Sequence, residues 1–202
     1  MGKVLADISM SLDGYVTAPG ADLSNGLGVG GEPVHAWVFA QDSPADAAIL
    51  QESMARTGAV VMGRRTFDIV DGPDGWNDEM GYGAGPGQAS SGPPVFVVTH
   101  RAPESWRLGP RFRFVGSVAD AVAQARAAAG DQDVVVMGGG EVVRQSVVQG
   151  LADELRIHLS PVLFGGGTPL FAPDDNGVRE LRQTDVVVTP CATHLTYEVA
   201  GR

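Results

Sequence analysis

Three uninterrupted apolar runs constrain the fold of this chain more than any other feature. They read Val60-Val61-Met62, Val95-Phe96-Val97-Val98 and Val134-Val135-Val136-Met137. A strand that is buried on both faces shows no alternation of apolar and polar residues, and such strands are typical of a parallel sheet covered by helices. The three runs therefore predict the central strands of an α/β domain.

The rest of the chain extends this pattern. We expect strands over residues 4–9, 59–62, 95–99, 113–115, 134–137, 155–162, 186–189 and 193–199. Ser43-Pro44 predicts a helix start and a helix to about Arg56, Ser117 caps an Ala-rich helix over 118–129, and a third helix covers 141–149. The last 50 residues lack a helical pattern, which predicts an antiparallel C-terminal strand beside a mainly parallel sheet. We expect one domain over residues 1–202.

Charge and cysteine content exclude several classes of function. The formal net charge of −10 opposes nucleic-acid binding, and no basic cluster offsets it. A single cysteine, Cys191, allows no intrachain disulfide and fits a reducing compartment. Because the chain runs directly into a predicted strand and lacks an apolar run of about 18 residues, we expect a cytoplasmic protein without a membrane partner.

Glycine is abundant, at 28 of 202 residues, and gathers in two stretches. Residues 18–31 and 72–94 are rich in Gly and Pro, and we expect both to form long surface loops. Long loops in compact domains often cover a functional site.

Two strand-to-helix junctions have features that suit an anion. Gly63-Arg64-Arg65-Thr66 follows the first apolar run, and Gly138-Gly139-Gly140-Glu141-Val142 follows the third. Backbone amides at a helix N-terminus attract anions, and glycine lets a phosphate approach closely. Each motif also has a simpler interpretation, because a glycine triplet can be a tight turn and an arginine pair a solvated surface.

A third junction, Thr99-His100-Arg101, places another cation at the end of a predicted strand. Ligands of open α/β sheets bind outside the carboxyl ends of the strands. Three such ends with cations and glycines suggest one large anionic ligand, such as a dinucleotide.

Other chemistries find little support in the sequence. The Rossmann pattern G-x-G-x-x-G fails at Gly138, because Val143 occupies the third glycine position. Lys3 is the only lysine, which excludes a P-loop. The four histidines lie far apart in the chain and there is one cysteine, so we expect no metal site.

The motifs together resemble a known family. Gly63-Arg64-Arg65-Thr66-Phe67, Met137-Gly138-Gly139-Gly140-Glu141-Val142 and the opening Ser9-Met10-Ser11-Leu12-Asp13-Gly14-Tyr15-Val16 are similar to motifs of dihydrofolate reductases. Residues 153–171, which contain Ser160-Pro161-Val162-Leu163-Phe164-Gly165-Gly166-Gly167, resemble more closely the reductase domain of riboflavin biosynthesis. The resemblance implies a three-layer α/β/α fold and an NADPH-dependent reductase.

The resemblance also implies a set of cofactor residues. The turns at Gly63–Thr66 and Gly138–Val142 would hold the pyrophosphate, and Arg64 with Thr99-His100-Arg101 would face the adenosine 2′-phosphate. Ser9 and Val16 fall where the family contacts the nicotinamide. These positions coincide with the junctions that the residues themselves mark as suited to an anion.

Two residues are candidates for the substrate side. Asp46 lies within one residue of the position where folate reductases have a carboxylate, although an acid in the first turn of a helix is also favoured by the helix dipole. His158 lies near a substrate-side polar position of the family, and a half-exposed strand histidine is the alternative. Either could supply the proton that accompanies a hydride.

The function we expect is hydride transfer from NADPH to a C=N or C=O bond of a small pteridine- or pyrimidine-like substrate, similar to 5-amino-6-(5-phosphoribosylamino)uracil reductase. Two alternatives remain. One is a non-catalytic module that binds a nucleotide or flavin-like ligand, and the other is a folate-specific dihydrofolate reductase. Relatives in the riboflavin branch are commonly dimers, so a homodimer is also expected.

Overall fold

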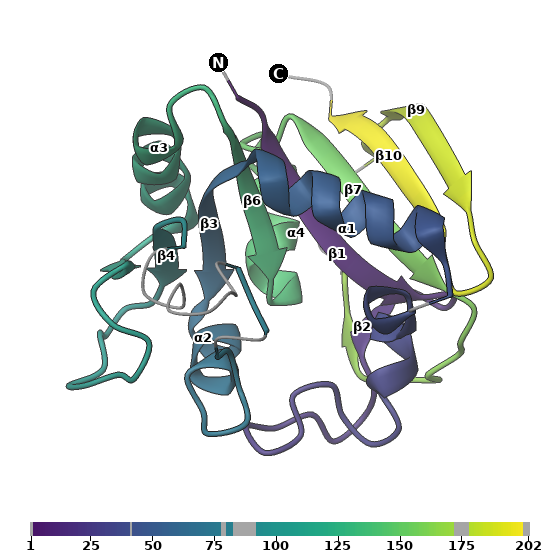
Figure 1. Cartoon of the computed structure of the whole chain (residues 1–202), viewed down its shortest axis with the longest axis horizontal. Coiled ribbons are helices and arrows are strands. Elements are labelled where there is room, and N and C mark those ends of the chain that lie inside the picture. The colour runs from purple at the N-terminus through teal and green to yellow at the C-terminus, as the bar shows by residue number, and fades with distance from the viewer. Residues whose placement is uncertain (1, 41, 78–79, 83–91, 172–177, 200–202) are drawn as a thin grey trace.

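A computed structural model describes residues 2–40, 42–77, 80–82, 92–171 and 178–199. The main sheet has the strand order β5-β4-β3-β6-β1-β7-β10-β9 (Figure 1). The elements are β1 (Val4–Ser11), β2 (Tyr15–Thr17), η1 (Glu32–Phe39, a 3₁₀ helix), α1 (Pro44–Arg56), β3 (Thr57–Gly63), α2 (Arg64–Val70), β4 (Val95–Val98), β5 (Phe112–Val115), α3 (Val118–Ala129), β6 (Asp133–Gly138), α4 (Gly140–Val148), β7 (Glu154–Ser160), β8 (Thr168–Pro169), β9 (Leu181–Val188) and β10 (Thr193–Val199).

The sheet is mostly parallel, as predicted. Strand β1 pairs in parallel with β6 on one side and with β7 on the other, and β3, β4 and β5 continue the parallel part. Strand β10 runs antiparallel between β7 and β9. The predicted fold class, with an antiparallel C-terminal strand, is confirmed. Because β1, β3, β4, β6 and β7 are parallel, their carboxyl ends share one edge of the sheet.

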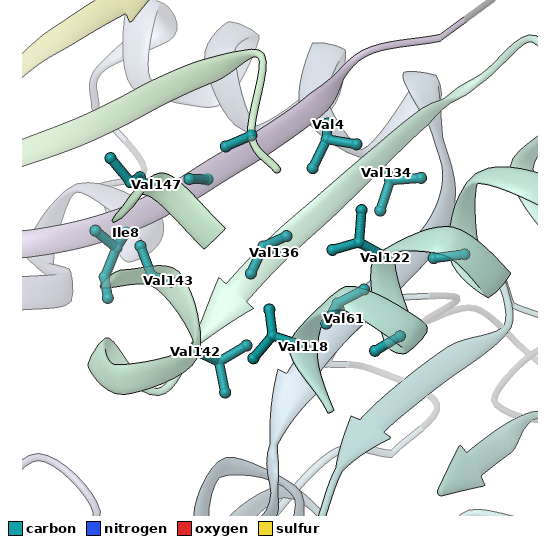
Figure 2. Packing of buried hydrophobic residues seen from close by; sticks show 14 of the residues in the cluster. Val4, Ile8, Val61, Val118, Val122, Val134, Val136, Val142, Val143 and Val147 are labelled. Atoms are coloured by element: carbon teal, nitrogen blue, oxygen red, sulfur yellow. The ribbon is translucent and has the colours of Figure 1, made fainter. Parts of the chain in front are cut away.

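Helices cover both faces of this sheet and give three layers. Helices α3 and α4 pack on one face, where strand residues such as Val4, Val61 and Val136 meet Val122 and Val143 (Figure 2). Helix α1 crosses in front of β1 and β7 on the other face (Figure 1). A second apolar cluster around Phe67 joins α2 to β3 and β4. The apolar runs of β3, β4 and β6 are therefore buried from both sides, which explains their lack of alternation.

Local signals place two of the helices as the sequence indicated. The Ser43 hydroxyl accepts a hydrogen bond from the Asp46 amide at the start of α1, and Ser117 accepts one from the Asp120 amide at the start of α3. Gly130 ends α3 with a positive φ of 62°, a conformation that glycine adopts without strain.

Other elements differ from the prediction. The 3₁₀ helix η1 and the short pair β2–β8 were not expected, and β9 starts at Leu181 rather than near residue 186. The predicted loop at 18–31 is present between β2 and η1, whereas much of the predicted loop at 72–94 lies outside the described residues. None of the described helices combines the length and apolar character that crossing a membrane requires.

Candidate active site

The two glycine turns predicted to hold a cofactor meet at the carboxyl edge of the sheet. A Cβ atom on Gly63 would lie 3.1 Å from Val142 Cγ2 and 3.4 Å from the Gly139 nitrogen. On the other side, a Cβ on Gly138 would lie 3.3 Å from Thr66 Oγ1. The Gly138–Gly139 peptide is cis. The turns at Gly63 and Gly138, 75 positions apart in the sequence, thus form one continuous backbone surface. Side chains in place of these glycines would cover that surface.

Val16 closes this surface from a third element. A Cβ on Gly140 would lie 2.8 Å from Val16 Cγ2, so strand β2 touches the first residue of helix α4. Val16 is itself buried. Ser9, the other residue predicted near the nicotinamide, lies buried on β1 and accepts a hydrogen bond of 2.9 Å from the Trp37 indole. The structure therefore brings Val16 to the glycine turns and gives Ser9 a protein partner.

A cationic cluster lies at the ends of β3 and β4. The Arg64 guanidinium donates to the Arg101 carbonyl at 2.7 Å and pairs with Asp68, also at 2.7 Å. The Thr99 hydroxyl donates to the same Arg101 carbonyl at 2.9 Å. The predicted 2′-phosphate residues Arg64, Thr99 and Arg101 are thus neighbours, and His100 lies exposed between the last two.

Two other predicted cofactor residues point elsewhere or into solvent. Arg65 is exposed at the start of α2. The pKa of Asp22 is lowered mainly by the hydrogen bond from the Ser24 hydroxyl, and the charge of Arg65 adds to this. The carboxylate of Glu141 pairs with Arg144 and accepts from Gln145 along the surface of α4. The backbone of Glu141 would serve an anion, while its side chain belongs to the helix surface.

This arrangement fits the phosphates of a dinucleotide. The Val142 and Val143 amides in the first turn of α4 donate to the Gly139 carbonyl, at 3.0 and 3.3 Å. The Gly140 and Glu141 amides come before the first residues that can donate within the helix, and they follow the glycine turn. Such amides and the positive end of the helix dipole favour a phosphate. The Arg64 guanidinium, which is bonded to the Arg101 carbonyl, supplies positive charge that suits a second phosphate group.

The two predicted catalytic residues belong to a buried chain of four side chains. His194 Nε2 lies 2.7 Å from Asp46 Oδ1, and the Nδ1 atoms of His194 and His158 lie 2.7 Å apart. His158 Nε2 lies 3.1 Å from Asp7 Oδ1. We refer to these four residues, Asp7, His158, His194 and Asp46, as the Asp–His tetrad. They come from β1, β7, β10 and α1.

The Asp–His tetrad is closed at one end and accessible at the other. The exposed fractions of the side chains are 0% for Asp46, 7% for His194, 5% for His158 and 17% for Asp7. Trp37 of η1 covers the centre, with its ring centroid 4.0 Å from that of His158. A polar cavity of about 320 Å³ adjoins both histidines, lined in part by Glu52, Glu154, Arg156 and Asp185.

Burial and hydrogen bonding act in opposite directions on these groups. Burial would raise the pKa of Asp7, but the charge and hydrogen bond of His158 hold that pKa below its ordinary value. Burial would likewise raise the pKa of Asp46, and hydrogen bonds from Ser43 and His194 lower it. The pKa of His194 is lowered, mainly by burial. Both carboxyl groups are therefore ionised at neutral pH.

Sequence reasoning missed Asp7 and His194. Asp7 had a usable signal, because a charged residue inside a buried central strand is rare unless it is paired. Alternation along β1 and β7 also places Asp7 and His158 on the same face of the sheet. Trp37 and Trp76 are both buried.

The chain is similar to one protein family and to several solved structures. The model of the RibD C-terminal domain family matches residues 2–195. No curated protein matches. A protein from Shewanella sp. PV-4 assigned to riboflavin biosynthesis is 25% identical, with 98% of each chain covered and a TM-score of 0.64.

Two further solved structures share the fold at lower identity. A pyrimidine reductase-like protein from Corynebacterium diphtheriae is 14% identical, with 100% of this chain and 93% of that chain covered and a TM-score of 0.65. A diaminohydroxyphosphoribosylaminopyrimidine deaminase/5-amino-6-(5-phosphoribosylamino)uracil reductase from Thermotoga maritima is 14% identical with a TM-score of 0.61. The match covers 98% of this chain and 57% of the Thermotoga protein.

The family match extends over nearly the whole chain and includes both glycine turns, the cationic cluster and the Asp–His tetrad. It supports an oxidoreductase of the RibD type. The chain belongs to the RibD C-terminal domain family.

Proposed function

We propose that this protein is an NADPH-dependent reductase that transfers a hydride to a C=N or C=O bond of a small pyrimidine- or pteridine-like substrate. The observation that carries the proposal is the meeting of the two glycine turns beside the cluster of Arg64, Thr99 and Arg101. Family membership and the names of the similar proteins support the same reaction class.

Bound NADPH would supply the hydride, and the protein would supply position and exclusion of water. The amides of the Gly138–Gly140 turn would hold the pyrophosphate, together with the Gly63–Thr66 turn. Arg64 and Arg101 would face the 2′-phosphate, which distinguishes NADPH from NADH. Val16 and Ser9 would border the nicotinamide.

The proposal is tested by titrating the protein with NADPH and NADH while following nicotinamide fluorescence. Replacing Arg64 by Gln should weaken NADPH binding about 10- to 100-fold, because a charge-assisted hydrogen bond contributes about 1.5–3 kcal/mol. NADH binding should change little, since NADH has no 2′-phosphate. Arg113→Gln is the matched control, because the Arg113 guanidinium on β5 lies over the Phe96 ring on β4.

Two results would contradict parts of this proposal. Equal loss of NADPH and NADH binding in Arg64→Gln would remove the 2′-phosphate argument. NADPH binding by the wild type without turnover over a broad panel of pyrimidines and pteridines would favour the non-catalytic binding module.

A folate-specific reductase is less favoured by the geometry. Its substrate carboxylate would be Asp46, whose side chain is 0% exposed and bonded to His194. We therefore expect weak methotrexate binding.

A further inference from the structure

The hydrogen bonds of the Asp–His tetrad fix the number of protons that it holds. Three contacts link the four side chains, at 3.1, 2.7 and 2.7 Å, and each needs one proton between its two atoms. Two neutral imidazoles carry two protons, and two ionised carboxylates carry none. One more proton is required, so one of the histidines is an imidazolium.

The surroundings select which histidine carries the charge. The His158 ring lies against the face of Trp37 at a centroid distance of 4.0 Å, and an aromatic face stabilises a cation. His194 meets the same indole edge-on, at 5.2 Å and 81°. With the charge on His158, its Nε2–H donates to Asp7 and its Nδ1–H donates to His194. His194 is then neutral, and its Nε2–H donates to Asp46.

We propose that Asp7, His158, His194 and Asp46 act as one buried unit that holds three protons at neutral pH, with the positive charge on His158 and with Asp7 as the end that passes a proton to the substrate. The first part of this proposal is independent of the proposed function, and the part concerning the substrate rests on it. Asp7 is chosen because its side chain is the most exposed of the four, at 17%. It also lies on β1 two residues before Ser9.

The proton balance of a reduction assigns each group a task. The π bond of the substrate C=N breaks, its carbon receives the hydride with two electrons, and its nitrogen receives a proton. The Nε2 proton of His158 moves onto the Asp7 carboxylate, and Asp7 passes that proton to the substrate nitrogen. His158 is then neutral, and solvent returns the third proton before the next cycle. His194 and Asp46 are positioning residues that hold the His158 ring.

Charged groups from every neighbouring element act on this unit. They are Glu52 on α1, Glu154 and Arg156 on β7, Asp185 on β9, His35 on η1, and Tyr82, whose pKa is raised mainly by burial and also by the charge of Asp7. Arg156 pairs with Glu154 at 3.1 Å, so this pair adds little net charge.

Long-range ¹H–¹⁵N NMR of the imidazole rings tests the protonation directly. The chain has four histidines, so His35→Gln and His100→Gln identify the two resonance sets of the tetrad by subtraction. We expect one ring with both nitrogens protonated at pH 7 and one ring protonated on Nε2 alone. Two neutral rings, or two imidazolium rings, would overturn the proposal, and this measurement needs no substituted tetrad residue.

The role of Asp7 is tested with Asp7→Asn, using 5-amino-6-(5-phosphoribosylamino)uracil as the probe and circular dichroism to verify the fold. We expect NADPH binding to stay unchanged while single-turnover hydride transfer falls about 100-fold, the scale of a general acid. The pH dependence of the transfer step should also disappear. His35→Gln is the matched control, because His35 lies near His158 without a bond to it.

The outcomes separate the two proposals. An Asp7→Asn variant that transfers hydride at the wild-type rate with the wild-type pH profile would remove Asp7 as the proton source. A wild type that binds NADPH and reduces no probe would count against the proposed function, and the NMR result then decides the protonation of the unit alone.

Discussion

At the scale of single residues, Trp37 combines two contacts that substitutions can separate. Its indole Nε1–H donates to Ser9 at 2.9 Å, and its ring lies against His158. Trp37→Phe keeps a ring and loses the hydrogen bond, so it should lower the free energy of unfolding by about 1 kcal/mol. Trp37→Ala also leaves a cavity and should cost about 3–5 kcal/mol. Urea unfolding measures both, and equal losses would show that the ring contact contributes nothing.

Some residues of the candidate site could be predicted from the sequence, and others could not. Gly63, Gly138 and Arg64 follow strands that the sequence makes visible, so their meeting at one edge could be predicted from the parallel topology. Asp7 could be singled out as a charged residue in a buried strand, but its contact could not be predicted, and neither could that of His194, because the partners lie 151 and 148 positions away. The register of β1, β7 and β10 decides those contacts, and register is a property of the folded sheet.

At the scale of elements, the contact between β2 and α4 gives a test of the glycine turn. Gly140→Ala would place a methyl group 2.8 Å from Val16 Cγ2, and a β-branched side chain has few rotamers with which to avoid it. We expect a loss of about 1–3 kcal/mol in the free energy of unfolding from this overpacking. Gly116→Ala is the control, since a Cβ there meets nothing within 4 Å.

The double variant Gly140→Ala/Val16→Ala makes the test specific. Removing Cγ2 of Val16 should relieve the clash, so the double variant should be more stable than the sum of the single losses by about 1 kcal/mol or more. Additive losses in the free energy of unfolding would mean that residues 16 and 140 do not interact in the Gly140→Ala variant. A cycle measured by urea unfolding distinguishes these results.

Elements with strong local signals were predicted well, and those fixed by tertiary contacts were not. Helix α3 matches its predicted range of 118–129, because Ser117 and Gly130 mark both ends. The 3₁₀ helix η1 lacks a regular spacing of apolar residues. It is held against the sheet by a hydrogen bond from the Ser160 hydroxyl on β7 to the Val34 carbonyl. Strand β9 is mostly exposed and polar at its start, so its pairing with β10 is what extends it to Leu181.

At the scale of the whole molecule, the candidate cofactor site and the Asp–His tetrad lie on different parts of the sheet, one at its carboxyl edge and one on a face. The carboxyl edge gathers backbone amides and arginines from β3, β4 and β6, which suits an anionic cofactor. The face beneath α1 gathers buried acids and histidines from β1, β7 and β10. The buried charges on that face link the stability of the entire fold to pH.

The last prediction concerns that pH dependence. The pKa values of His194 and His35 are lowered mainly by burial. Those of Asp7, Asp46 and Asp133 are also lowered, because hydrogen bonds and opposite charges outweigh burial. A folded-state pKa below the unfolded value means that the unfolded chain binds more protons in that range, so stability falls as pH falls.

The unfolded pKa values set two stages for this loss. The free energy of unfolding should begin to fall below about pH 6.5 as unfolded histidines take up protons, and it should fall again below about pH 4 as carboxylates do. Urea unfolding between pH 8 and 3 measures the curve. Asp133→Asn should weaken only the second stage, since Asp133 bonds to Arg56 and to the Lys3 amide rather than to a histidine. Stability that stays constant from pH 7 to 5 would show that burial of the imidazoles does not contribute.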